Sequence, residues 1–221
     1  MQKQIVRTIN LKNKEFLSYL DEISDLILDL NNNVKMKKPW PEEAANFISE
    51  KYCDDVIAQG TGHEGFPDYS YFLPMGGDSK GLIDPILDNN PYFKNNIVNQ
   101  LTKLNNKLQL FLGAGHCALF SFYPAEGFIS WHNNANAPGY NVIFTWSETG
   151  EGFFQYRDEN NKTVKVNDSK GWSAKLCRFP SYTEAPLYHS AYTKCRRFTC
   201  AYIFEDQNDI WDNLCMDLMD E

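Results

Sequence analysis

The chain has 221 residues, of which 43% are hydrophobic and 14% aromatic, so it can bury one good core, and we expect a single domain over 1–221. Its formal net charge of −8 argues against a nucleic-acid partner, because affinity for polyphosphates comes largely from clustered Lys and Arg. No stretch approaches the roughly eighteen consecutive apolar residues of a membrane helix, so we expect no membrane partner.

Cysteine usage indicates a reducing compartment. The six cysteines form no CxxC pair and have no regular spacing; they are Cys53, Cys117, Cys177, Cys195, Cys200 and Cys215. The opening MQKQIVRTINLKNK lacks the apolar core of a signal peptide. We therefore expect reduced thiols and a cytoplasmic protein.

The first part of the chain, 1–113, has the pattern of helices and loops. One predicted helix has an apolar face with three- and four-residue spacing, formed by Phe16, Leu20, Ile23, Ile27 and Leu30. A shorter helix is predicted from Pro41 through EEAANFISEKY, and a third over 93–112 that ends at the cap residue Gly113. Between them, residues 60–91 are rich in Gly and Pro and predict an irregular loop, a natural place for a substrate lid.

After Gly115 the pattern changes to short β-rich runs separated by turns. We expect eight strands, near 116–123, 127–132, 140–147, 152–157, 162–166, 173–178, 187–190 and 196–204. Eight short strands favour a double-sheet jelly roll whose mouth holds a ligand, with its core over 114–206. The helical region would support one outer sheet, and a last helix within 207–221, near 208–219, would close the chain.

Two histidines are the best candidates for chemistry. His132 in FISWHNN and His189 in PLYHSAY each lie in an apolar segment of strand-like composition. Imidazole is the commonest biological metal ligand, and two rings from separate strands could hold a divalent iron if a third protein ligand is nearby. The alternative is that both are core residues with satisfied hydrogen bonds. His63 and His116 have no partners at useful spacing, and we expect them to be structural.

Segments 120–157 and 171–206 resemble the double-stranded β-helix of the Fe(II)- and 2-oxoglutarate-dependent oxygenases, with the prolyl and aspartyl or asparaginyl hydroxylase branches nearest. FSFYPAEGFISWHNN is similar to the strand, turn and first-ligand strand of that family. YNVIFTWSETGEGFFQY is similar to the strand pair that follows it, and PLYHSAYTKCRRFTCAYIFED is similar to the distal-histidine strand with its trailing basic residue. The fold implied is a mainly β jelly roll preceded by a helical region.

The resemblance implies a role for several residues. His132 and His189 would ligate the iron, and Arg197 would pair with the distal carboxylate of 2-oxoglutarate, for which a planar guanidinium is well suited. Thr199, on the same strand face as Arg197, would donate its hydroxyl to that carboxylate. Contacts with the cosubstrate are also implied for Tyr123 and Thr145.

The sequence departs from the family at Asn134, which stands where a metal-binding carboxylate is usual, two residues after His132. Three outcomes are open. The Asn134 oxygen could ligate the metal with less affinity than a carboxylate, the position could be left to water or to chloride as in halogenating relatives, or catalysis could be lost. Glu148 and Glu151 lie in a turn at the wrong end of the strand to replace the carboxylate.

The implied activity is hydroxylation of an unactivated C–H bond, with O2 as oxidant and conversion of 2-oxoglutarate to succinate and CO2. We favour an amino-acid side chain, free or in a protein, as the substrate, and a nucleobase stays open. Two hypotheses of other classes are a non-catalytic jelly-roll module that binds a ligand in its mouth, and a structural protein in which the histidines only pack.

Overall fold

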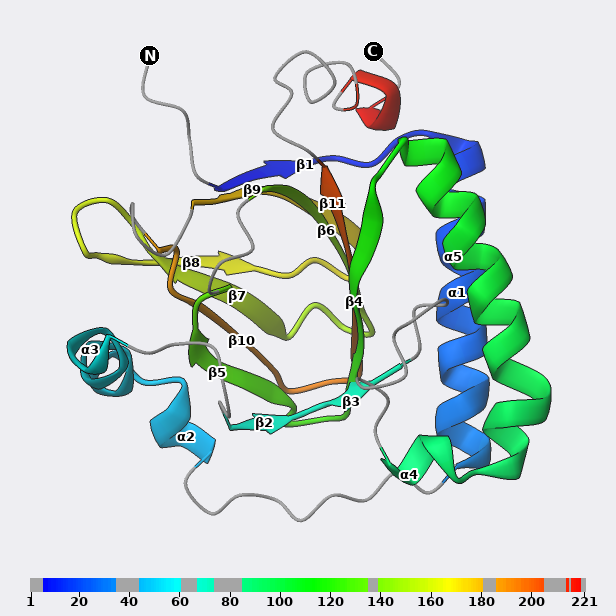
Figure 1. Ribbon diagram of the computed structural model, residues 1–221, viewed down its shortest axis with the longest axis horizontal. Coiled ribbons are helices and arrows are strands. Elements are labelled where there is room, and N and C mark those ends of the chain that lie inside the picture. Colours follow the sequence, from blue (N-terminus) through cyan, green and yellow to red (C-terminus); the bar gives the residue numbers. More distant parts are fainter. Residues whose placement is uncertain are drawn as a thin grey trace.

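The computed structural model describes residues 6–34, 44–60, 67–73, 85–134, 139–180, 186–204, 214 and 216–219. Two antiparallel sheets face each other and form a jelly roll (Figure 1). One sheet has six strands in the order β1-β9-β6-β11-β4-β3, and the other has five in the order β2-β5-β10-β7-β8. This arrangement confirms the predicted fold class.

The strands of the six-stranded sheet are β1 (Val6–Ile9), β3 (Tyr71–Phe72), β4 (His116–Tyr123), β6 (Gly139–Ser147), β9 (Gly171–Phe179) and β11 (Arg197–Phe204). The strands of the five-stranded sheet are β2 (Asp68–Tyr69), β5 (Phe128–His132), β7 (Gly152–Arg157), β8 (Thr163–Asn167) and β10 (His189–Thr193). The eight predicted strands are all present, two of them with the predicted ends and the others with ends displaced by at most three residues.

Three strands were not predicted. The expectation of an irregular segment over 60–91 is wrong at three places: β2 pairs with β5, β3 pairs with β4, and Pro85–Asp88 form the helix α4. These strands have two residues each, which is too short to show an alternation of apolar and polar residues in the sequence. They are defined only by their pairing with β5 and β4. Strand β1 was missed for a similar reason, since it is a four-residue edge strand on β9. Within the predicted lid, residues 61–66 and 74–84 lie outside the described residues.

The helices are α1 (Lys14–Asn33), α2 (Ala44–Phe47), α3 (Glu50–Gln59), α4 (Pro85–Asp88) and α5 (Val98–Leu112), and a π-helical turn, Phe93–Ile97, precedes α5. The single helix predicted from Pro41 is wrong in part: two helices meet at Ser49, whose hydroxyl caps α3 by accepting from the Tyr52 N–H at 3.2 Å. Gly113 caps α5 with φ 63°, as predicted. Of the predicted C-terminal helix, Leu214 and residues 216–219 are described and helical.

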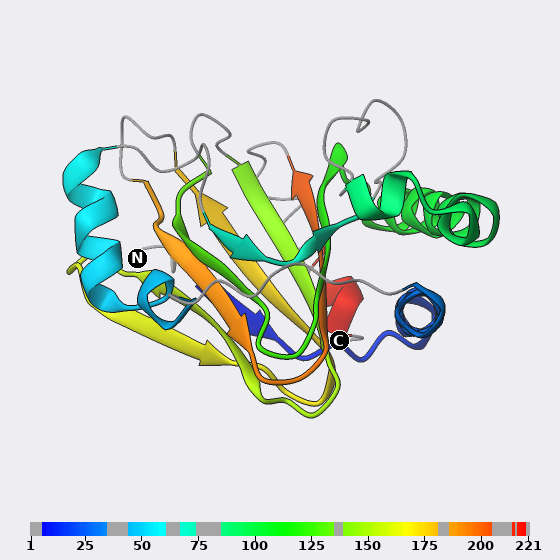
Figure 2. The ribbon, with the colours of Figure 1, turned by 90° about the horizontal axis from the view of Figure 1, so that it is seen from below.

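Helices α1 and α5 lie side by side on the outer face of the six-stranded sheet, while α2 and α3 lie at the five-stranded sheet (Figures 1 and 2). Helix α1 begins where the Asn13 side chain accepts a hydrogen bond from the Phe16 N–H at 3.0 Å. Its predicted apolar face, from Phe16 to Leu30, is buried against the sheet and α5. The helical region therefore supports one sheet from outside.

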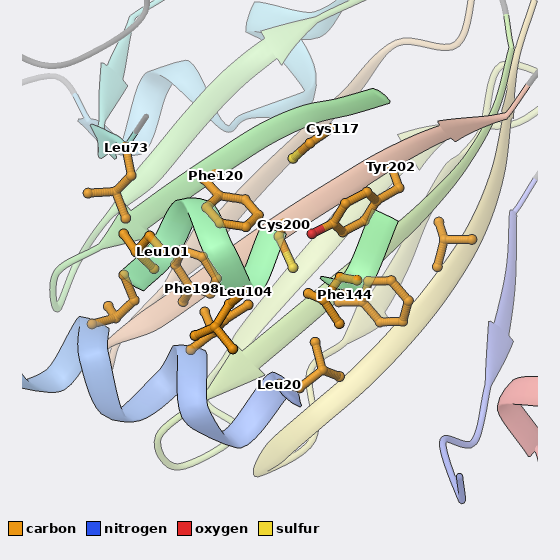
Figure 3. Close-up of a cluster of buried hydrophobic side chains, with 14 of the residues drawn as sticks. Leu20, Leu73, Leu101, Leu104, Cys117, Phe120, Phe144, Phe198, Cys200 and Tyr202 are labelled. Carbon is orange, nitrogen blue, oxygen red and sulfur yellow. The ribbon is translucent and has the colours of Figure 1, made fainter. Parts of the chain in front are cut away.

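Strand alternation divides the six-stranded sheet into two chemically different faces. On β11, Phe198, Cys200 and Tyr202 belong to the apolar core under the helices, where they meet Leu101 and Leu104 of α5 (Figure 3). The intervening residues of the same strand have side chains on the opposite face, toward the other sheet. The larger apolar core thus lies outside the barrel. The barrel interior contains a smaller apolar cluster, which includes Ile143, Phe154 and Phe179, together with polar groups.

Two further properties concern the described ranges. The five cysteines within them, Cys53, Cys117, Cys177, Cys195 and Cys200, form no disulfide. In the same ranges no helix is long and apolar enough to cross a membrane.

The junction of α1 with the sheet is a test of the core. Phe16 is fully buried, and its ring centroid lies 4.9 Å from that of Phe144 and 5.1 Å from that of Phe111. We expect Phe16→Ala to lower the free energy of unfolding by about 3–5 kcal/mol, because it leaves a cavity between helix and sheet. The matched control Leu110→Ala, at a side chain 85% exposed on α5, should change it by about 0.5 kcal/mol or less. Equal losses in denaturant titrations of the two variants would contradict this account.

Candidate functional site

His132 and His189 lie directly opposite each other on the paired strands β5 and β10. Their ring centroids are 4.2 Å apart, and the residues are 6% and 8% exposed. The aromatic rings of Phe154 and Phe179 lie 5.5 Å and 5.0 Å from that of His189. The two imidazoles that the sequence singled out therefore meet inside the barrel.

A β-bulge turns His132 into the interior. His189 pairs with His132, but Ala191 pairs with Ile129, so β5 contains one residue more than β10 between these pairs. Ile129 packs inside the barrel with Tyr123, whereas Trp131 packs outside it in the cluster around α3. Strict alternation would place Ile129 and His132, three residues apart, on opposite faces, and the extra residue brings them to the same face. The sequence analysis did not predict this bulge.

Backbone carbonyls fix the tautomer of both rings. His132 Nδ1 lies 2.7 Å from the Ser130 carbonyl oxygen, and His189 Nδ1 lies 3.0 Å from the Leu187 carbonyl oxygen. A carbonyl oxygen can only accept, so Nδ1 of each ring donates, and in the neutral ring the lone pair is on Nε2. This is the arrangement by which metal-binding histidines are commonly oriented.

Both histidines line a cavity of about 610 Å³ between the sheets. Asn134, which is half-buried, lines the same cavity, as do His116 and Asn141. The rest of the described wall is apolar except for the Cys117 thiol, and consists of Phe72, Leu73, Cys117, Ala118, Leu119, Phe120, Ile129, Ile143, Phe179, Ala201 and Ile203. His63, in contrast, lies outside the described residues.

The described parts of the chain contain no group of three or more His, Cys, Asp or Glu side chains that could hold a metal ion. The imidazole and amide groups that line the cavity belong to His132 and His189 of the five-stranded sheet, to Asn134 beside them, and to His116 and Asn141 of the six-stranded sheet. Glu148 and Glu151 do not line the cavity: Glu148 forms an ion pair with Arg196, and Glu151 accepts from the Thr149 hydroxyl in the turn.

A second buried group contains the four residues for which a cosubstrate contact is predicted, Arg197, Thr199, Thr145 and Tyr123. The Arg197 Nη1 donates to Thr199 Oγ1 at 2.7 Å, and Nη2 donates to Thr145 Oγ1 at 3.4 Å. The guanidinium carbon lies 5.0 Å from the centre of the Tyr123 ring. Arg197 is 2% exposed.

Two residues that the sequence analysis missed complete this group. Asp168 Oδ2 accepts from Arg197 Nε at 2.8 Å, and Asp168 Oδ1 accepts from Lys175 Nζ at 3.1 Å. The three side chains are at most 2% exposed. We call Asp168, Lys175 and Arg197 the buried triad. Asp168 lies in a segment, VNDSKGW, with the composition of an exposed turn, and only the charged Lys175 within the apolar run AKLC hinted at a buried partner.

Burial and mutual attraction act against each other in the triad. Burial raises the pKa of the Asp168 carboxyl, but Arg197 and Lys175 outweigh it and hold that pKa below its ordinary value. Burial lowers the pKa of the Lys175 ammonium, and Asp168 offsets this only in part. Asp168 is therefore ionised at neutral pH and holds both cations.

The triad lies below the cavity along the strands. Ala201 and Ile143 form part of the cavity wall, and Thr199 and Thr145 are the next inward-facing residues on the same strands. The described residues that line the cavity do not include Arg197. The histidine pair and Arg197 thus lie at two levels of one interior, with the row of Lys175, Ile143 and Ala201 between them.

No family model and no curated protein matches this sequence. Solved structures similar to the chain include a Pseudomonas putida prolyl-4-hydroxylase, with 15% identity, TM-score 0.35 and coverage of 73% of this chain and 90% of that one. A full-length Neurospora crassa protein in complex with alpha-KG and thymine has 13% identity, TM-score 0.41 and coverage of 90% and 75%.

The Schizosaccharomyces pombe Cnp3 cupin domain is similar over less of the chain, with 11% identity, TM-score 0.26 and coverage of 44% of this chain and 61% of that one. These likenesses are distant, so the jelly-roll assignment depends on the strand order and pairing described above.

Removing Asp168 should be costly. We expect Asp168→Ala to lower the free energy of unfolding by about 3–5 kcal/mol, because it leaves two buried cations without their counter-ion. The matched control is Asp54→Ala, which breaks the Arg157–Asp54 ion pair at a carboxylate 61% exposed and should change it by about 1 kcal/mol or less. Similar losses of unfolding free energy in urea titrations of the two variants would show that the buried triad stabilises the fold no more than an exposed ion pair does.

Proposed function

We propose that this protein is an Fe(II)- and 2-oxoglutarate-dependent dioxygenase that hydroxylates an unactivated C–H bond of an amino-acid side chain, free or in a protein, with formation of succinate and CO2. The observation that carries the proposal is the pairing of His132 with His189, both with Nδ1 held by a carbonyl, on the wall of a cavity that Asn134 shares. The sequence resemblance supplies the identity of the metal and the cosubstrate.

The residues present fit an iron ion. Rings with centroids 4.2 Å apart and lone pairs on Nε2 can ligate one cation, and the Asn134 side-chain oxygen is the third candidate ligand. All three ligands are neutral, so they would bind the ion less tightly than a set that includes a carboxylate. When bound, iron and 2-oxoglutarate would supply the activation of dioxygen.

The remaining residues would orient the reactants and exclude water. Arg197, with the hydroxyls of Thr199 and Thr145, would bind the distal carboxylate of the cosubstrate below the metal. The apolar wall around the histidines, including Ile143 and Phe179, would exclude water from the reacting groups and hold an uncharged part of the substrate beside them.

A second candidate is a non-catalytic jelly-roll module that binds a ligand in the cavity. Two observations favour it: the described cavity wall has no carboxylate, and Arg197 already has hydrogen-bond partners in Asp168, Thr145 and Thr199. In this case the histidines would bind a ligand, or a metal without redox chemistry.

Anaerobic addition of Fe(II) and 2-oxoglutarate decides between the two. We expect a visible metal-to-ligand charge-transfer band in the wild type, none in His189→Ala, and an unchanged band in Lys165→Ala, where an exposed β8 lysine is removed. Admission of oxygen should then yield succinate. The absence of a band in the wild type at saturating cosubstrate would reject the dioxygenase.

Asn134→Asp tests whether position 134 faces the metal. We expect Fe(II) to bind about tenfold more tightly or better in a chelator competition, because a carboxylate adds a negative charge to a neutral ligand set. The matched control is Asn141→Asp, which places the same charge in the same cavity from the other sheet. Equal gains in the two variants would mean that the charge acts at a distance and that residue 134 is not a ligand.

A further inference from the structure

The buried triad has one positive charge in excess. Lys175 and Arg197 carry two positive charges and Asp168 one negative charge, and the three side chains are at most 2% exposed. The nearby Cys177 thiol, whose pKa burial raises to about 12, adds no negative charge at neutral pH. An uncompensated charge in a buried place is costly unless an anion completes the group.

Hydrogen-bond donors are also in excess. Among the described residues, Lys175 Nζ reaches one acceptor, Asp168 Oδ1, although an ammonium group has three N–H donors. The five N–H donors of Arg197 meet Asp168, Thr199, Thr145 and the Tyr123 side chain. Buried donors usually have acceptors, so the unused N–H groups of the triad indicate that an additional acceptor binds there. An anion is the acceptor that two basic side chains favour.

The backbone is shaped to hold the Asp168 carboxylate in place. A Cβ atom on Gly152 would lie 2.6 Å from Asp168 Oδ2, so any larger residue there would displace the carboxylate. The Asp168 N–H donates to the Gly152 carbonyl oxygen at 2.9 Å, which ties Asp168, directly after β8, to the first residue of β7. Asp168 is therefore a rigid bridge between Lys175 and Arg197.

The register of the six-stranded sheet places Lys175 between the cavity and Arg197. Lys175 of β9 pairs with Ile143 of β6, which pairs in turn with Ala201 of β11, and both of these apolar residues line the cavity. Arg197 is four residues before Ala201 on β11, hence two inward-facing positions deeper. A ligand that enters from the cavity would meet the row of Lys175 before it reaches Arg197.

We propose that Lys175 is a second cationic anchor for the distal carboxylate of the cosubstrate, and that Asp168 is a positioning residue that holds Lys175 and Arg197 as a pair around it. This inference rests on the proposed function for the identity of the dicarboxylate. It does not depend on the metal, because the excess charge and the unused donors belong to the triad alone.

The test compares two keto acids that differ at the far end. 2-Oxoglutarate has a distal carboxylate and 2-oxopentanoate has a methyl group in its place. Both are titrated calorimetrically into metal-free protein and, anaerobically, into protein with Fe(II). We expect the wild type to bind 2-oxoglutarate more tightly than 2-oxopentanoate. Lys175→Met should reduce this preference at least about tenfold, because it removes one charge-assisted contact, and should leave the affinity for 2-oxopentanoate unchanged.

Lys165→Met is the matched control, since it removes an exposed lysine of β8, and its preference should equal that of the wild type. Lys175→Met leaves Asp168 and Arg197 as a one-to-one pair, so it should fold; Lys175→Gln replaces it if it does not. No preference in the wild type, or an equal preference in wild type and Lys175 variants, overturns the inference. A preference for 2-oxoglutarate that depends on Lys175, in a protein that gives no charge-transfer band, supports the anion site. It rejects only the proposed dioxygenase function.

Discussion

The alternation of side chains along the six-stranded sheet is the constraint on which the rest of the molecule depends. Every second residue of β11 packs under α1 and α5, so the larger of the hydrophobic clusters forms outside the barrel. The barrel interior is thereby released from forming the main core and can contain histidines, hydroxyls and three buried charges. A register shift of one residue would move Arg197 into the apolar core and Phe198 into the polar interior, so the helices also fix the site.

Sequence patterns predicted the parts of this structure that are local. The apolar face from Phe16 to Leu30 and the cap at Gly113 depend on neighbouring residues, and both are present. The two-residue strands β2 and β3 and the bulge before His132 depend on pairing between distant segments, which no local pattern records. The site divides in the same way.

His132, His189 and Arg197 were visible because their residue types are unusual in apolar strands. Asp168 was not visible, because a carboxylate in a segment of Asn, Asp, Ser, Lys and Gly looks like any exposed turn. Its burial follows from two contacts with residues 7 and 29 positions later in the chain. The same contacts explain why Lys175 can stand in the middle of a strand: its charge is held by Asp168, and its neighbours Ala174 and Leu176 face the helices.

The separation of the interior into two levels restricts the kind of ligand that can use both. The upper level offers imidazole and amide ligands without a formal negative charge, and the lower level offers two cations with one counter-ion. A monocarboxylate could satisfy either level but would leave the other unfilled. Under the proposed function, a dianion with a chelating group at one end and a carboxylate at the other would neutralise the metal above and the excess charge below in one binding event. The apolar side chains of Ile143 and Ala201, which share a row with Lys175, would then contact the middle of the ligand, which favours a ligand with a short aliphatic segment between its two polar ends.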